Sequence, residues 1–178
     1  MNILHDINRE RIKPDDFIAV IEIEKNGKNK YELDKETGLL YMDRILYTST
    51  HYPANYGFIP LTHCDDNDPL DVFVYCSQPI LPMSLVRCYP LGAIDMIDSD
   101  KVDTKIIAVP FSDPQFNTYK DIKELPPHLI EELMHFLRVY KDLENKTTII
   151  DGFHSCEYAK KQIEKAIEDY KKRINFDW

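Results

Sequence analysis

The stretch FIAVIEIE at residues 17–24 predicts the fold class of this chain. Its side chains alternate in character and many are β-branched, which is typical of a β-strand. Five more segments of this kind follow, separated by clusters of Pro, Gly, Asn and Asp: residues 30–34, 39–43, 71–76, 85–96 and 105–109. The first two thirds of the chain are therefore predicted to be mainly β-structure.

The last third of the chain has the periodicity of helices. An apolar stripe with spacings of three and four follows Pro126-Pro127, a pair that favours a helix start: Leu129, Leu133, Phe136, Leu137 and Tyr140. A second stripe has the same spacing, with Ser155 as the predicted N-cap: Ala159, Ile163, Ala166, Ile167 and Tyr170. Strands first and helices last predict a barrel or curled sheet with two helices packed outside it.

Length and composition indicate one globular domain spanning residues 1–178, because 43% of the 178 residues are hydrophobic. No apolar run approaches the ~18 residues that cross a bilayer, and residues 1–11 lack the apolar core of a signal peptide. We therefore expect a soluble cytoplasmic protein without a membrane partner. The net charge of −9 repels nucleic acid, although metal ions could still bridge an acidic site to an anion.

The cysteines and histidines do not suggest a zinc or disulfide site. Cys64, Cys76, Cys88 and Cys156 are widely spaced, and we expect reduced, mostly buried thiols. The six histidines are scattered, with no pair on one helix face at the spacing of metal ligands.

A hairpin is predicted between residues 17–24 and 30–34, and two turns are considered. A two-residue Asn26-Gly27 turn would leave Glu22 on the face opposite the charged residues of the second strand. A three-residue loop at 25–27, with Gly27 left-handed in a bulge, instead sets Glu22 opposite Lys30. We favour the second, because Glu22, Lys30 and Glu32 then share one face of a wet polar cleft.

The acidic stretch DDNDPLD at residues 65–71 is the sharpest local signal. Pro69 favours an extended backbone at Asp68, so that Asp66 and Asp68 point the same way and Asp71 reaches the next strand. Clustered carboxylates repel one another unless a cation lies between them, and hard oxygen ligands suit magnesium or manganese. The competing interpretation is an exposed, solvated turn, because Asp, Asn and Pro are also turn residues.

Two other functions fit this stretch less well. A calcium-binding helix-loop-helix loop needs an oxygen ligand at Leu70, glycine at Asp71 and glutamate at Ser77. An aspartyl-phosphate phosphatase resembles only residues 66–68, and should have an apolar strand before its first aspartate.

Several motifs, in order and covering residues 17–153, resemble the soluble inorganic pyrophosphatases of family I. The acidic signature of that family is similar to DNDPLDV at 66–72, and its first two strands are similar to VIEI at 20–23 and KYE at 30–32. The other matching segments are Asp43-Arg44, YPANYG at 52–57, the group Asp98, Asp103 and Lys105, and YKDLE at 140–144.

The resemblance implies a five-stranded barrel of the oligonucleotide/oligosaccharide-binding type, flanked by two α-helices. It also implies an inorganic diphosphatase that uses several Mg²⁺ ions per active site, with Mn²⁺ or Zn²⁺ as substitutes and Ca²⁺ as an inhibitor. The expected assembly is a homohexamer built as a dimer of trimers. Val139 departs from the histidine that many bacterial members have near a subunit contact, and Thr147 and Phe153 replace positions that are often tryptophan.

The resemblance also implies the roles of the site residues. The metal ligands would be Glu32, Asp66, Asp71, Asp98 and Asp103, with Asp71 bridging two ions. Asp68 would take a proton from a metal-activated water that attacks pyrophosphate directly, with no covalent intermediate, and Tyr56 would tune the arrangement. The phosphate oxygens would be held by Lys30, Arg44, Tyr140 and Lys141, with Lys105 as a substrate contact or a charge-balancing neighbour. Glu22 and Tyr52 would support these groups.

Charge explains why metals are needed. The matched site has seven carboxylates against four basic side chains, and pyrophosphate carries a charge of about −4 when fully ionised. Divalent cations would reverse the sign of the site and allow the anion to bind. The rival hypothesis is a nucleic-acid-binding module of the same barrel type, which should have a basic groove with exposed aromatic side chains instead.

Overall fold

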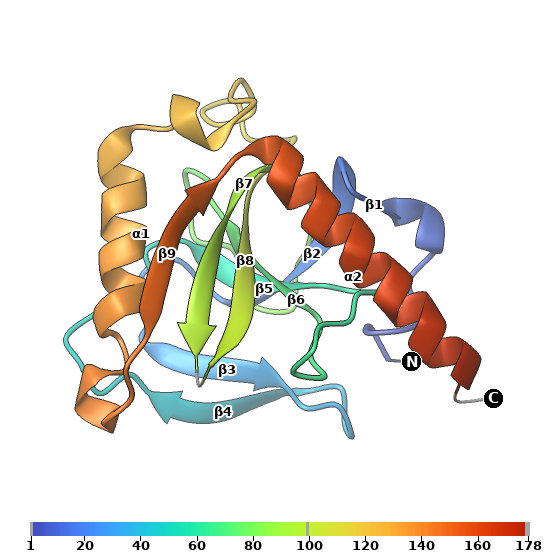
Figure 1. Cartoon of the computed structure of the whole chain (residues 1–178), viewed down its shortest axis with the longest axis horizontal. Helices are drawn as coiled ribbons and strands as arrows, with labels where there is room; N and C mark the ends of the chain where they lie inside the picture. The colour runs from blue at the N-terminus through green and yellow to red at the C-terminus, as the bar shows by residue number, and fades with distance from the viewer. Residues whose placement is uncertain (1, 99, 177–178) are drawn as a thin grey trace.

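Five strands close into a ring in the computed structural model, which describes residues 2–98 and 100–176 (Figure 1). In spatial order they are β2 (Asp16–Ile23), β5 (Asn55–Ile59), β6 (Leu70–Val74), β8 (Lys101–Pro110) and β7 (Leu85–Asp98), and β7 pairs back onto β2. Within this ring β6 and β8 run parallel and the other neighbours are antiparallel. Closure leaves the ring without free edges. The predicted five-stranded barrel is confirmed.

The predicted pairing of the first hairpin is wrong. β3 (Asn29–Leu33) pairs with β4 (Leu40–Ile45) in a separate two-stranded sheet, whereas β2 pairs with β5 and β7. Both edges of β2 are already occupied, so no edge remains for β3. The connection also differs from both turns considered, because Asn26 and not Gly27 has the left-handed backbone, with a φ of 68°.

Three strands lie outside the segments predicted from periodicity. β1 (Ile12–Lys13) extends the ring sheet beside β2, and β9 (Ile149–His154) extends it beside β7. The third is β5, which is short and contains Gly57. An added Cβ at Gly57 would lie 1.8 Å from the carbonyl oxygen of Val20, so the close approach of β5 to β2 requires glycine there.

The alternation expected in β2 is absent, because every residue from Phe17 to Ile23 is buried. Successive residues of the ring strands enter two apolar clusters on opposite faces of the sheet. Val72 and Ile106 belong to the cluster that includes α2 (Cys156–Phe176), and Phe73 and Ile107 belong to the cluster that includes α1 (Pro127–Val139). Burial on both faces removes the polar side that an alternating pattern would need.

The two predicted helices are confirmed. α1 begins at Pro127, and the Oγ of Ser155 accepts a hydrogen bond from the backbone N–H of Tyr158 at the start of α2 (3.3 Å). Short 3₁₀ segments complete the chain: η1 (Arg9–Arg11), η2 (Ile122–Glu124) and η3 (Asp142–Glu144). No helix in the described part of the chain is long and apolar enough to cross a membrane.

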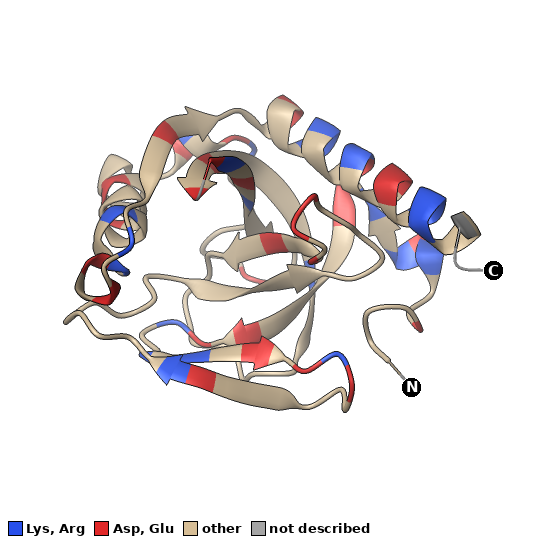
Figure 2. Cartoon of the chain, turned by 60° about the horizontal axis from the view of Figure 1, so that its bottom comes forward, with Lys and Arg blue, Asp and Glu red and all other residues tan. Residues whose placement is uncertain are grey.

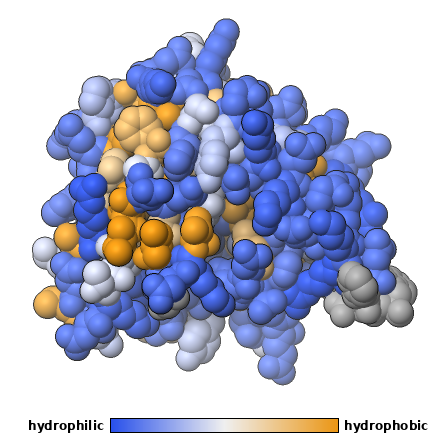
Figure 3. All heavy atoms as spheres, in the orientation of Figure 1, coloured by the Kyte–Doolittle hydropathy of each residue, from blue (hydrophilic) through white to orange (hydrophobic). Residues whose placement is uncertain are grey.

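Apolar side chains also reach the outer surface near β9. Figure 3 shows them gathered on the face that carries β9 in Figure 1, and the exposed ones include Val102, Ile149 and Phe153. The face of α2 in the same view is hydrophilic. All four cysteines are free thiols.

Candidate active site

One cavity of about 570 Å³ brings together nearly all the residues that the sequence singled out. Its walls come from the ring strands, the acidic loop at 65–71, the β3–β4 sheet and the end of α1. Figure 2 marks the positions of the acidic and basic residues along the ribbon. Seven carboxylates line it: Glu22, Glu32, Asp34, Asp66, Asp68, Asp71 and Asp103. Four ammonium groups face them: Lys30, Lys35, Lys105 and Lys141. The cavity therefore has a surplus of negative charge.

The acidic loop is held in shape by its own backbone. The N–H of Asn67 and the carbonyl of Asp68 both bond to the backbone of Cys64, at 3.0 and 2.9 Å. The N–H of Asp68 also donates to the side chain of Asp66 (3.0 Å). Asp66 and Asp68 consequently both line the cavity, and Asp71 follows on β6.

Lys105 is the most deeply buried charged group of the site, with its side chain 6% exposed. Its Nζ lies 2.5 Å from Asp71 and 2.9 Å from Asp103, and it donates to the hydroxyl of Tyr56 (3.2 Å). Burial alone would lower the pKa of Lys105, but the nearby groups Asp71, Tyr56 and Asp103 together outweigh it, and the net pKa lies well above the usual value. Burial raises the pKa of Asp71, and Lys105 opposes that shift. Lys105 thus stays an ammonium that neutralises part of the acidic wall.

The other carboxylates of the site are also interleaved with lysines. Lys35 lies 2.5 Å from the carboxylate of Asp68 and donates to the carbonyl of Asn67 (3.0 Å). Lys30 pairs with Glu32 beside it on β3, and Lys141 lies 2.8 Å from Asp98. The contacts of Lys35 and Lys141 join the turn after β3 and the segment after α1 to the acidic loop and to β7.

Glu22 is a buried carboxyl, 8% exposed, on β2. Its Oε1 accepts a hydrogen bond from the backbone N–H of Leu33 (2.7 Å), which attaches the end of β3 to the ring. Burial raises the pKa of Glu22 to about 8, and the nearby charge of Asp71 adds to the shift. The expectation that Glu22, Lys30 and Glu32 face one polar space is confirmed, although tertiary packing and not a hairpin brings them together.

The tyrosines form the apolar side of the cavity. The buried ring of Tyr52 packs against Tyr56 and Phe136, with centroids 5.4 and 4.9 Å apart. Tyr140, directly after α1, stacks on Phe136 at 4.9 Å. The ring of Tyr52 is therefore a packing group between β5 and α1.

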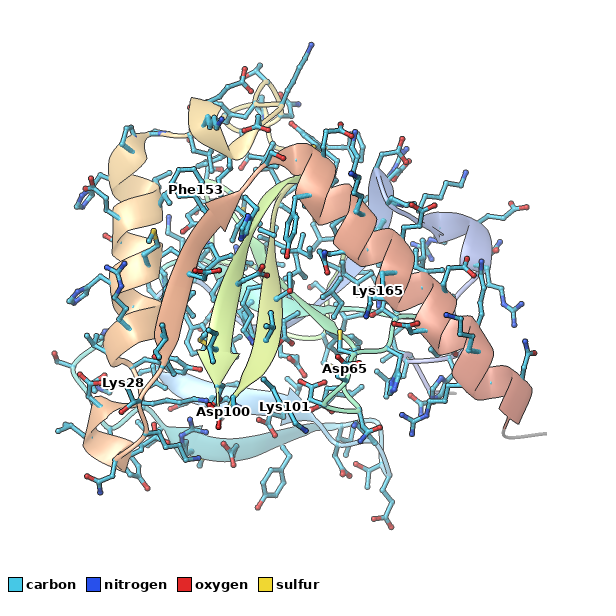
Figure 4. All side chains as sticks on the ribbon, viewed as in Figure 1. Lys28, Asp65, Asp100, Lys101, Phe153 and Lys165 are labelled. Atoms are coloured by element: carbon cyan, nitrogen blue, oxygen red, sulfur yellow. The ribbon has the colours of Figure 1, made fainter. Side chains whose placement is uncertain are left out.

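Two predicted residues, Arg44 and Asp98, do not line this cavity. Arg44 lies on β4 as the cross-strand partner of Lys30, and Asp98 lines a second cavity of about 700 Å³. The two cavities share Asp66, Asp71 and Asp103. Figure 4 shows Asp65, Lys101 and Lys165, which also line the second cavity.

Lys35 and Glu144 are two charged residues of this region that sequence reasoning did not single out. Glu144 is an ion-pair partner of Arg44 at 2.8 Å. Glu144 is the last residue of the YKDLE motif at 140–144, and Lys35 follows the KYE motif at 30–32. No local pattern indicates that Lys35 reaches the acidic loop or that Glu144 reaches β4, so these two contacts could not be predicted from the sequence.

The donor set fits hard divalent cations. All the candidate ligands are carboxylates, and the carboxylates that line the cavity outnumber its ammonium groups. Within the described ranges no three Asp, Glu, His or Cys side chains already form a metal cluster, because lysines stand between the carboxylates. Metal ions binding here would replace ammonium groups as the partners of these oxygens.

Comparison with known proteins agrees with this geometry. A family model described as inorganic pyrophosphatase matches residues 19–171. The chain belongs to the inorganic pyrophosphatase family. It is 46% identical over 170 residues to soluble inorganic pyrophosphatase 1 of Arabidopsis thaliana, covering 96% of this chain and 80% of that protein.

Solved structures of the family share the fold. The inorganic pyrophosphatase of Helicobacter pylori superposes with a TM-score of 0.87 at 42% identity, covering 90% of this chain and 96% of that one. The Thermus thermophilus enzyme gives a TM-score of 0.91 at 32% identity, covering 96% and 99%. The chain is thus an inorganic diphosphatase of the soluble family I, a metal-dependent group whose reaction is the hydrolysis of inorganic pyrophosphate.

The raised pKa of Glu22 predicts a pH-dependent stability for the metal-free protein. Between the ordinary value of 4.5 and about 8, folded Glu22 keeps a proton that the unfolded chain releases. The contribution of Glu22 to the free energy of unfolding is therefore fully present below pH 4.5 and decreases as the pH rises toward 8. In EDTA, the melting temperature should fall less between pH 5 and pH 8 for Glu22→Gln than for the wild type.

Thermal unfolding followed by circular dichroism measures this difference, with Glu24→Gln as the control because Glu24 is exposed just beyond the end of β2. An equal loss of melting temperature in wild type and Glu22→Gln would contradict the assignment.

Proposed function

We propose that pyrophosphate is hydrolysed in the 570 Å³ cavity by direct attack of water, without a covalent enzyme intermediate. One observation carries this proposal: seven carboxylates and four ammonium groups from distant segments converge on a single cavity. Carboxylates suit divalent cations, and ammonium groups suit phosphate oxygens. Phosphoryl transfer depends mainly on positioning and on charge neutralisation, which such a set supplies.

The cofactor we propose is Mg²⁺, several ions per site, with Mn²⁺ or Zn²⁺ as substitutes and Ca²⁺ as an inhibitor. The residues that would hold these ions are Glu32, Asp66, Asp71, Asp98 and Asp103. Bound ions supply positive charge to the phosphates and make water more acidic. The surplus of carboxylates in the cavity supports this assignment.

Asp68 is the proposed general base. Its side chain is 55% exposed at the cavity mouth, where it is accessible to water and substrate. In this role it accepts the proton of the attacking water, and the ammonium of Lys35 lies 2.5 Å from its carboxylate. Tyr56, joined to Lys105 at 3.2 Å, is proposed to orient this arrangement by hydrogen bonding.

The proposed phosphate contacts are Lys30, Arg44, Tyr140 and Lys141. They come from the β3–β4 sheet and from the segment that follows α1, so they approach the substrate from outside the ring. Their positive charge and hydroxyl donors stabilise the leaving phosphate. For Lys105 we favour the charge-balancing role, because its Nζ is already bound by two aspartates.

Glu22 and Tyr52 are proposed to support the site without touching the phosphates. The bond from Glu22 to the backbone of Leu33 and the packing of Tyr52 on Tyr56 favour this role. We further propose that residues 1–178 form a single domain that works in the cytoplasm on free pyrophosphate, and that neither nucleic acid nor a membrane is a partner. The acidic cavity lining supports the choice of enzyme over nucleic-acid module.

For assembly we propose a homohexamer built as a dimer of trimers. The exposed apolar side chains near β9 support self-association, because such side chains are usually covered by a partner when they cluster. Sedimentation velocity at micromolar concentration should give a species of six chains. A stable monomer would contradict this proposal.

Phosphate release from pyrophosphate tests the function and its metal. Turnover should require added Mg²⁺, stop in EDTA and return when Mg²⁺ is restored. Ca²⁺ should bind and compete with Mg²⁺ but support little turnover, because it is larger and a weaker Lewis acid. Full activity with Ca²⁺ alone would overturn the proposed chemistry.

Asp68→Asn tests the general base. The amide keeps the size of the side chain but cannot take a proton, so kcat should fall by ~10²–10⁴. Folding and most metal binding should survive, whereas Asp71→Asn should also weaken metal binding. Asp65→Asn is the matched control, because Asp65 is an exposed carboxylate of the same loop that does not line this cavity.

The measurements are steady-state kinetics at saturating Mg²⁺ from pH 6 to pH 9 and calorimetric titration with Mg²⁺. Near-normal turnover of Asp68→Asn across that range would exclude Asp68 as the base and leave the loop a metal scaffold.

A further inference from the structure

Glu144 is a buried carboxylate that the proposed chemistry leaves without a role. It lies in η3, three residues after Lys141, and its side chain is 8% exposed. Its Oε2 is fully buried and has no hydrogen-bond partner among the described residues. Burying a carboxylate in this way is costly, so a specific contact must compensate for the loss of water.

That contact is an ion pair with Arg44. Oε1 of Glu144 lies 2.8 Å from the Nε of Arg44, and a carboxylate oxygen of Asp43 lies 2.5 Å from its Nη1. Burial lowers the pKa of Arg44, but the carboxylates of Asp43 and Glu144 together outweigh it, and the net pKa is raised. The guanidinium is thus held by one carboxylate from its own strand and one from a distant segment.

The position of Arg44 makes this second carboxylate significant. Arg44 and Lys30 are cross-strand partners in the β3–β4 sheet, which stands apart from the closed ring. Two-stranded sheets have little stability of their own and need outside contacts to fix their place. Lys141 belongs instead to the segment after α1 and pairs with Asp98 at 2.8 Å. The Glu144–Arg44 contact is therefore a bridge between the two segments that carry phosphate-binding cations.

We propose that Glu144 is a positioning residue that fixes the guanidinium of Arg44, and with it the β3–β4 sheet, relative to Lys141. The inference rests on the proposed function, in which Arg44 and Lys141 hold the two phosphates. Glu144 acts through Arg44 and does not touch the substrate. Loss of its charge therefore weakens substrate binding more than it slows the chemical step.

A double-mutant cycle tests this role. The four proteins are the wild type, Glu144→Gln, Arg44→Lys and the double variant, assayed for kcat and KM with pyrophosphate at saturating Mg²⁺. Glu144→Gln should raise KM ~5- to 20-fold while kcat changes less than ~3-fold, as expected when a guanidinium that binds substrate loses its charged partner. Arg44→Lys should also raise KM. The double variant should match Arg44→Lys alone, because Glu144 then has no guanidinium to position.

Asp16→Asn is the matched control. Asp16 makes a similar carboxylate–arginine pair with Arg87, at 2.6 and 2.8 Å, but on the surface away from the cavity. This variant should leave KM and kcat unchanged. Glu144→Asp, which keeps the charge, should recover part of the substrate affinity.

Each outcome separates this inference from the proposed function. Independent, multiplying effects of the two substitutions, or an unchanged KM in Glu144→Gln while Arg44→Lys is impaired, would overturn the role of Glu144. An unchanged KM in Arg44→Lys would instead remove Arg44 from the proposed function. Thermal unfolding checks the fold, and loss of folded protein in both Glu144→Gln and Glu144→Asp would assign Glu144 to stability alone.

Discussion

The buried ammonium of Lys105, held between Asp71 and Asp103, is the interaction on which the rest of the site depends. Lys105 and Asp71 are register partners in the parallel pair β6–β8. Their contact therefore follows from how the ring closes. Without this charge, two carboxylates would face one another in a poorly solvated wall. The same ammonium reaches the hydroxyl of Tyr56, so it links three ring strands at the floor of the cavity.

The ring and the β3–β4 sheet both supply charged groups to the cavity. The ring and its acidic loop contribute Glu22, four aspartates and Lys105, whereas β3 and the turn after it contribute Lys30, Glu32, Asp34 and Lys35. The lysines of the β3–β4 sheet and its turn thus lie opposite the aspartates of the ring and the acidic loop. The attachments are themselves polar: Glu22 to the backbone of Leu33, and Lys35 to the acidic loop.

Carboxylates and lysines alternate in the wall of the cavity. Most of its carboxylates lie against a lysine, and the carboxylates of Asp68 and Asp71 are both 2.5 Å from an ammonium group. Such pairs lower the repulsion between neighbouring acids. A divalent cation can replace these ammonium groups, because it is smaller and carries more charge to the same carboxylate oxygens. Because carboxylates outnumber ammonium groups in the cavity, additional positive charge can bind there.

The sequence by itself determined the elements that depend on local pattern. Periodicity predicted six strands and both helices. Residue types predicted Ser155 as a cap and the acidic loop. Each of these signals lies within a short window of residues. The resemblance to a family predicted the residues that the structure gathers at or beside the cavity. Tertiary structure alone decided which strand edges were free, and so paired β3 with β4 and not with β2. It also decided the contacts of Lys35 and Glu144, since ion pairs between segments far apart in the chain leave no trace in local sequence.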